Sequence, residues 1–164
     1  MKKGFGLTLI FLVFLLPISA LAFQNEPDGF RGIKWGANII SRSDMSSFVA
    51  DMYRRESDWL TIGEASLKQI LYVGYKGRLK GVAISYEGFS NSRKLKETFF
   101  QLYGKGYKPN RFIEEYYWFG NDVQIGLTYS EITREGHIGY YYLPLLKEEK
   151  EEMKEAAKKG ADDL

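Results

Sequence analysis

The chain has 164 residues, of which 45% are hydrophobic and 16% aromatic, with 23 basic and 21 acidic residues. The positive excess is Lys2 and Lys3 alone, so the remaining chain is neutral and gives no indication of a nucleic-acid-binding or anionic-membrane surface. The absence of cysteine from this sequence excludes disulfides, thiol chemistry and a lipid attached to cysteine.

Residues 1–22 have the three parts of a cleavable secretory signal peptide. Two lysines are followed by the almost wholly apolar run Leu7–Leu16, and the small residues Ala20 and Ala22 come after Pro17. We expect cleavage after Ala22, which leaves a periplasmic or secreted chain of 142 residues, the size of one domain. Membrane contact is then limited to export.

The alternative is an uncleaved anchor, because Gly4–Phe23 is twenty residues without a charge and is long enough to span a bilayer. Pro17 and the Ala-Leu-Ala ending favour cleavage. The sequence therefore divides into a signal peptide (1–22), a single domain (23–146) and a charged helical tail (147–164).

Two elements are expected in the first third of the mature chain. The alternation in Phe30–Trp35 predicts a short strand that Gly36 ends. Ser43 is a suitable N-cap for a first helix. One helical face would carry the apolar residues Met45, Phe48, Val49, Met52 and Tyr53.

A hairpin and a second helix follow. The segments Leu67–Tyr75 and Leu79–Tyr86 flank Lys76-Gly77, which predicts two paired strands. A helix capped by Asn91 or Ser92 should then end at Gly104. Its inner face would carry Leu95, Phe99 and Leu102.

The last third predicts three strands, Phe112–Phe119, Val123–Tyr129 and Ile138–Leu143, joined by glycine-containing turns. Beyond them Lys147–Lys159 is almost all Lys, Glu and Ala. This tail is typical of a solvated, partly frayed helix, and the alternative is a helix that docks a partner or acts as a spacer.

This order of elements predicts an α+β fold: an antiparallel sheet with two helices packed on one face, plus the charged C-terminal helix. Because each of the two helices would precede consecutive strands joined at a glycine-containing turn, a weak duplication of a helix-plus-hairpin unit is also expected.

No residue pattern here has the spacing that catalysis requires. His137 is the one histidine and cannot make a metal site alone, and no Gly-x-Ser-x-Gly or phosphate-binding loop is present. Glu114 and Glu115 are adjacent on a strand and point to opposite faces. We therefore expect no enzyme, no metal and no cofactor, with a small cell-envelope hydrolase as the alternative.

The candidate binding residues are the aromatic side chains Tyr72, Tyr116 and Trp118. They would share the sheet face opposite the helices with Gly74, Gly81, Ala83 and Gly126, if the helices cover Leu71, Val73, Val82, Ile84, Tyr117, Phe119, Ile125 and Leu127. Rings beside glycines can simply shield the backbone. Alternatively they form a platform that stacks on a sugar, a peptide or a protein.

The octapeptide Gly29–Gly36, reading Gly-Phe-Arg-Gly-Ile-Lys-Trp-Gly, follows directly on the expected leader. It resembles the opening of small, uncharacterised exported (periplasmic) proteins of Gram-negative bacteria, with a Phe-Arg-Gly-Ile-x-Trp-Gly segment after the signal peptide. Tyr72–Tyr86 and the helix ending in Leu102-Tyr103-Gly104 are also similar to that pattern. The resemblance implies a compartment and a fold, and no function.

From the sequence we therefore expect an exported periplasmic binding or interaction protein that uses an aromatic sheet face or its charged tail. Its partner would be an envelope protein or a glycan. Besides the hydrolase, the remaining alternative is a structural subunit of an envelope assembly, which would depend on residues 147–164.

Overall fold

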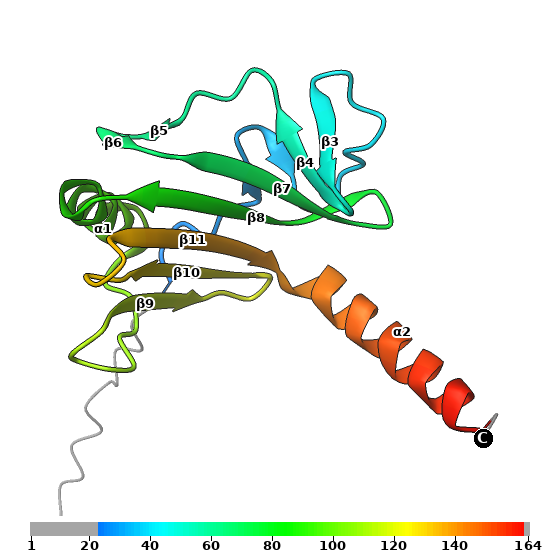
Figure 1. The fold of residues 1–164 in the computed structure, drawn as a ribbon. Helices are drawn as coiled ribbons and strands as arrows, with labels where there is room; N and C mark the ends of the chain where they lie inside the picture. Colours follow the sequence, from blue (N-terminus) through cyan, green and yellow to red (C-terminus); the bar gives the residue numbers. More distant parts are fainter. Residues whose placement is uncertain (1–22, 163–164) are drawn as a thin grey trace, which may run out of the picture.

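The computed structural model describes residues 23–162, which form an α+β fold on a seven-stranded antiparallel sheet (Figure 1). The expectations for residues 1–22 lie outside the described residues. In spatial order the strands are β3 (Met45–Val49), β4 (Met52–Arg55), β7 (Gln69–Tyr75), β8 (Arg78–Glu87), β11 (Glu135–Tyr142), β10 (Val123–Tyr129) and β9 (Glu114–Phe119). The predicted α+β class with a large antiparallel sheet is confirmed.

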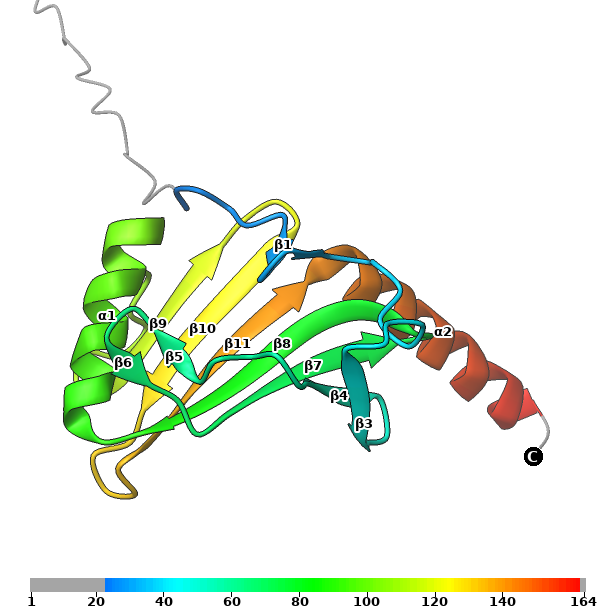
Figure 2. The ribbon, with the colours of Figure 1, turned by 90° about the horizontal axis from the view of Figure 1, so that it is seen from above.

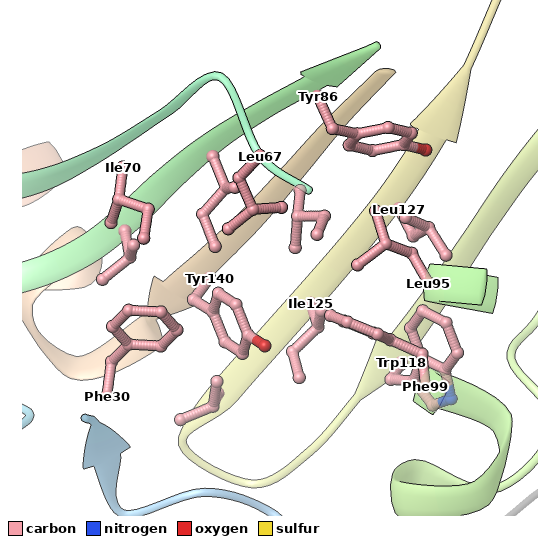
Figure 3. Packing of buried hydrophobic residues seen from close by; sticks show 14 of the residues in the cluster. Phe30, Leu67, Ile70, Tyr86, Leu95, Phe99, Trp118, Ile125, Leu127 and Tyr140 are labelled. Atoms are coloured by element: carbon pink, nitrogen blue, oxygen red, sulfur yellow. The ribbon is translucent and has the colours of Figure 1, made fainter. Parts of the chain in front are cut away.

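One face of this sheet is covered and carries the hydrophobic core. The covering elements are α1 (Phe89–Tyr103) and the short pairs β1 (Gly29–Phe30) with β2 (Ile33–Lys34) and β5 (Thr61–Ile62) with β6 (Ala65–Ser66) (Figure 2). Figure 3 shows Phe30, Leu95 and Phe99 from these elements packed against the side chains of the strands. We refer to this side as the core face and to the other as the outer face.

The helix α1 crosses the core face and connects β8 with the far edge strand β9. Its N-cap is Gly88, which makes no side-chain cap hydrogen bond and lies three residues before Asn91 and four before Ser92, the two predicted caps. Gly104 ends it, as predicted, with a φ of 79° that favours glycine. Leu102 is 46% exposed and Tyr103 is buried in its place, so the expectation that Leu102 faces the core is wrong.

The predicted helix at residues 43–53 is not formed, because this segment is the hairpin β3–β4. Its apolar residues fit a helical spacing, but Phe48 and Val49 are half exposed. Met52 and Tyr53 instead pair with β7 and extend the sheet. Without this helix, the expected duplication of a helix-plus-hairpin unit is also wrong.

The predicted strand Phe30–Trp35 is a tight reversal. Arg31 and Gly32 have φ values of 48° and 78°, and they turn the chain so that β1 pairs with β2. Trp35 packs beside Tyr140 and Tyr142, and its indole Nε1 donates a hydrogen bond to the Pro27 carbonyl oxygen at 2.8 Å. The octapeptide therefore folds back over the core face.

The second helix, α2 (Leu143–Asp162), begins directly after β11 and points away from the sheet (Figure 1). Leu145 is buried, whereas every residue from Lys150 to Ala161 is exposed. No helix among residues 23–162 is long and apolar enough to cross a membrane.

Candidate functional site

The three candidate binding residues lie in the core. Tyr72, Tyr116 and Trp118 are 0%, 8% and 3% exposed. They stand in two of the cross-strand rows of side chains on the core face, and Tyr72 and Trp118 are at the two ends of one of these rows. Read from β7 to β9, that row is Tyr72, Val82, Tyr140, Ile125 and Trp118, and its neighbour is Ile70, Ile84, Ile138, Leu127 and Tyr116.

The polar atoms of these buried rings are bound inside the protein. The Tyr72 hydroxyl donates to an Asp58 carboxylate oxygen at 2.8 Å, and the Trp118 Nε1 donates to the Gly104 carbonyl oxygen at 2.9 Å. Burial, together with Asp58, raises the pKa of Tyr72 well above its usual range. A platform made of these three residues is therefore a wrong expectation, and their role is to fill the core.

Two exposed aromatic residues of the sheet, Phe119 and Tyr141, are on the outer face. There the side chains of five strands, β7, β8, β11, β10 and β9, form three cross-strand rows, which we call the polar row, the small row and the aromatic row. In that order they are Gln69, Ser85, His137, Thr128 and Glu115; Leu71, Ala83, Gly139, Gly126 and Tyr117; and Val73, Gly81, Tyr141, Gln124 and Phe119.

Two tyrosine rings of this face lie over glycines of the small row. A Cβ atom at Gly139 would come within 2.6 Å of the Tyr141 hydroxyl, and one at Gly126 within 3.3 Å of the Tyr117 ring. Tyr117 also stacks on Phe119, with ring centroids 6.1 Å apart and an angle of 23°. The outer face thus carries the arrangement of rings beside small residues that the sequence suggested, built from other tyrosines.

A groove of about 1130 Å³ crosses the outer face over β7, β8 and β11. Its floor holds Leu71, Val73, Gly81, Ala83 and Gly139, and Tyr141 and Leu146 bound it toward α2. Arg54 and the part of the polar row formed by Gln69, Ser85 and His137 lie at its other side. Its volume is slightly above the range of about 300–1,000 Å³ usual for small-molecule sites, and apolar residues form most of its floor.

Charged groups around this groove are mostly paired with one another. The Lys68 ammonium lies 3.2 Å from Glu87 and 3.4 Å from Glu135, and the Lys80 ammonium lies 2.7 Å from Glu149 of α2. These pairs neutralise the rim, so the floor is an apolar surface rather than a charged one.

A second cluster, around Arg31, connects the octapeptide to residues 56–62. The Arg31 guanidinium lies 3.3 Å from Asp58, and it donates to the carbonyl oxygens of Trp59 and Thr61, both at 2.7 Å. It also lies over the Trp59 ring, 4.7 Å from the centroid. Since these contacts satisfy the arginine within the fold, we assign Arg31 a structural role.

The remaining candidate polar residues are separated. His137 is exposed in the polar row, with Ser85 and Thr128 as its cross-strand neighbours. Glu115 accepts a hydrogen bond from Tyr117, on the outer face. Glu114 binds Lys96, Lys108 and Tyr116 at 2.7–3.0 Å. These two adjacent glutamates thus have different partners.

Burial alone would raise the pKa of Glu114, but hydrogen bonds from Lys108, Lys96 and Tyr116 outweigh it and lower the pKa to about 2. Glu114 is thus an ionised partner in a local ion-pair cluster. Among residues 23–162 no group of three or more His, Asp or Glu side chains is placed to hold a metal ion.

The fold and this groove define an α+β protein with one sheet face that residues 23–162 leave uncovered. No protein-family model matches the chain, and no curated protein or solved structure is significantly similar to it. The assignment of a function therefore depends on the residues of the outer face.

Proposed function

We propose that the protein is exported and acts, in the periplasm or outside the cell, as a binding protein that receives its ligand in the outer-face groove. Export is supported by the three-part leader and by the likeness of Gly29–Gly36 to exported proteins. The predicted new N-terminus also fits, because the Phe23 ring packs on Tyr103 and the Gln24 amide donates to the Tyr103 carbonyl oxygen at 3.1 Å.

The observation that carries the binding proposal is the contrast between the two sheet faces. The core face is covered by α1 and the N-terminal segment, whereas no described element lies over Leu71, Val73 or Ala83 on the outer face. Small residues keep the floor of the groove open, and Tyr141 and Leu146 extend its apolar surface toward α2. An uncovered apolar surface of this kind is typical of a binding site.

The test is titration of the purified chain 23–164 with the uncharged fluorophore N-phenyl-1-naphthylamine. We expect a saturable increase in fluorescence at one site per chain. Ala83→Arg, which places a long charged side chain in the middle of the floor, should abolish it. The matched control is Thr128→Arg, on the same face of β10 but outside the groove.

Both positions point to solvent, so both variants should keep the melting temperature of the parent chain. Equal binding by Ala83→Arg and the parent chain would contradict the proposal, as would a fluorescence increase that does not saturate.

A further inference from the structure

Within the described part of the chain, the charges that line the outer-face groove leave one cation, Arg54, without a counterion. Arg55 lies 2.7 Å from Asp44, and Asp58 is held by Arg31. Lys68, Glu135 and Lys80 are in the ion pairs described above. Of the charged residues at the groove, Arg54 alone has no carboxylate within ion-pair distance among residues 23–162.

Arg54 is nevertheless held in a defined position at the polar side of the groove. Its guanidinium lies over the Phe48 ring, 3.8 Å from the centroid. The amide oxygen of Gln69, in the orientation that satisfies both groups, accepts from the Arg54 Nη2 at 2.6 Å and from its Nε at 3.3 Å. The remaining N–H groups of this planar fork are free to bind an anion.

The polar row continues from this arginine across the sheet. Gln69 pairs with Ser85, and Ser85 pairs with His137, so a hydroxyl and an imidazole stand about 5 and 10 Å from Gln69 at the usual strand spacing. Both are hydrogen-bonding groups, and they continue the polar side of the groove across the sheet, away from Arg54.

Next to this polar side the groove is apolar. Leu71 and Val73 follow Gln69 on the same face of β7, so this apolar side of the groove reaches about 13 Å from Gln69 at about 3.3 Å per residue. Ala83, Gly81 and Gly139 make the floor beside it, and Leu146 closes its far end. The groove is therefore positive and hydrogen-bonding at one side and apolar along its length.

We propose that the groove binds a fatty-acid-like carboxylate, with its anionic head at Arg54 and its apolar chain along Leu71, Val73 and Leu146. This inference rests on the proposed function and names its ligand class. A carboxylate matches the guanidinium fork in geometry and charge, and the paired rim residues offer no second cation for a doubly charged head. A single chain matches a groove with one apolar wall.

The experiment compares three probes of the same chain length, dodecanoate, dodecanol and dodecyltrimethylammonium, each used below its critical micelle concentration to displace N-phenyl-1-naphthylamine from chain 23–164. We expect dodecanoate to bind about tenfold more tightly than dodecanol, because one charge-assisted hydrogen bond contributes a difference of this size. The cation should bind most weakly. Arg54→Gln should remove the preference for dodecanoate and leave the affinity for dodecanol unchanged.

Two control variants separate this effect from a general loss of charge or of fold. Arg111 stacks on Phe112, 4.5 Å from the ring centroid, as Arg54 does on Phe48 but away from the groove. Arg111→Gln should therefore keep the tenfold preference. Arg54→Lys should keep part of it, because the charge stays while the planar fork is lost.

The outcomes distinguish the two proposals. Equal affinity for dodecanoate and dodecanol would overturn the carboxylate and leave the binding groove in place. Failure of all three probes to displace the fluorophore would also overturn it, and failure of the fluorophore itself to bind would overturn the groove. Sedimentation of the protein with phosphatidylglycerol vesicles, without binding of dodecanoate, would show that a lipid surface is the ligand and would also overturn the inference.

Discussion

Tyr86 on β8 stands directly opposite Gly136 on β11, and its ring lies across that glycine so closely that a Cβ atom there would overlap the phenol. The ring is fully buried, is stacked on Tyr129 and donates a hydrogen bond from its hydroxyl to the Thr128 carbonyl oxygen at 2.7 Å. Burial raises its pKa to about 12. The Tyr86 ring thus occupies the space that a side chain at Gly136 would take and covers the backbone there.

We therefore expect Gly136→Ala to destabilise the protein by about 1–3 kcal/mol, because the new methyl group must displace a ring that is fixed on all sides. Urea denaturation followed by tryptophan fluorescence measures the change. The control is Gly160→Ala, where the added methyl group meets no atom within 4 Å on an exposed helix, and stability should stay the same or rise slightly. Unchanged stability of Gly136→Ala would show that the Tyr86 ring can move aside.

Two neighbouring aromatic residues of β9 should differ sharply in their contribution to stability. Trp118 is 3% exposed and packs on Phe99 and Gly106, so Trp118→Ala should lower the free energy of unfolding by about 3–5 kcal/mol. Phe119, on the outer face, is 58% exposed, and Phe119→Ala should cost less than about 1 kcal/mol. Thermal denaturation of the two variants tests this assignment of faces. Similar losses for both would contradict it.

The sequence predicts most of the strands correctly but assigns some of them to the wrong face, and one residue explains much of this. The Lys76-Gly77 turn, with φ values of 50° and 75°, pairs Tyr75 with Arg78 and Gly74 with Leu79, as a two-residue hairpin requires. Continued without interruption, this register would place Leu71 opposite Val82, as expected from their hydrophobicity.

A β-bulge at Lys80 changes that register. Val73 pairs with Gly81, so Lys80 is the extra residue, and from there on Tyr72 rather than Leu71 stands opposite Val82. Because side chains alternate between faces, a shift of one residue moves Tyr72 into the core and Leu71 to the outer face. β7 has large apolar residues at both parities, so its pattern could not reveal the bulge.

The local sequence pattern also fails to predict the hairpin β3–β4. A helical spacing is satisfied by Met45, Phe48, Met52 and Tyr53. The structure instead pairs Met52 and Tyr53 with Val73 and Tyr72 at the edge of β7, a long-range contact that the local spacing does not reveal. Ala50, with a φ of 43°, turns the chain between the strands without any glycine to indicate it. The sequence therefore does not predict the groove either, because its polar side depends on Arg54, which this hairpin places next to Gln69.

Stability should depend on Glu114 at acid pH. Its pKa in the folded protein, about 2, lies below the ordinary value of 4.5, so its ion pairs stabilise the fold fully above pH 4.5. This contribution, about 1 kcal/mol after screening by solvent, is lost as the pH falls from 4.5 to about 2. Denaturant midpoints measured between pH 2 and 7 should thus be less pH-dependent for Glu114→Gln. The control is Glu131→Gln, at an exposed glutamate outside the ion pairs of the described chain, which should keep the parent's pH dependence.

The two halves of α2 should differ in dynamics. In its first half, Glu148 binds Arg78, Glu149 binds Lys80 and Glu152 binds Lys76, all three partners belonging to the β7–β8 hairpin. The second half, from Met153, is exposed throughout, and an isolated helix of this length is marginal in water.

Hydrogen exchange measured by mass spectrometry should therefore show slow exchange for the amides of residues 147–152 and fast exchange for residues 155–161. Glu149→Gln, which removes the partner of Lys80, should speed exchange in the first half and leave the second half as it was. The control is Glu155→Gln, in the exposed half, which should leave the first half unchanged. Slow exchange across the whole helix at low protein concentration would contradict the expectation, because the second half would then need a packing partner that the described residues do not provide.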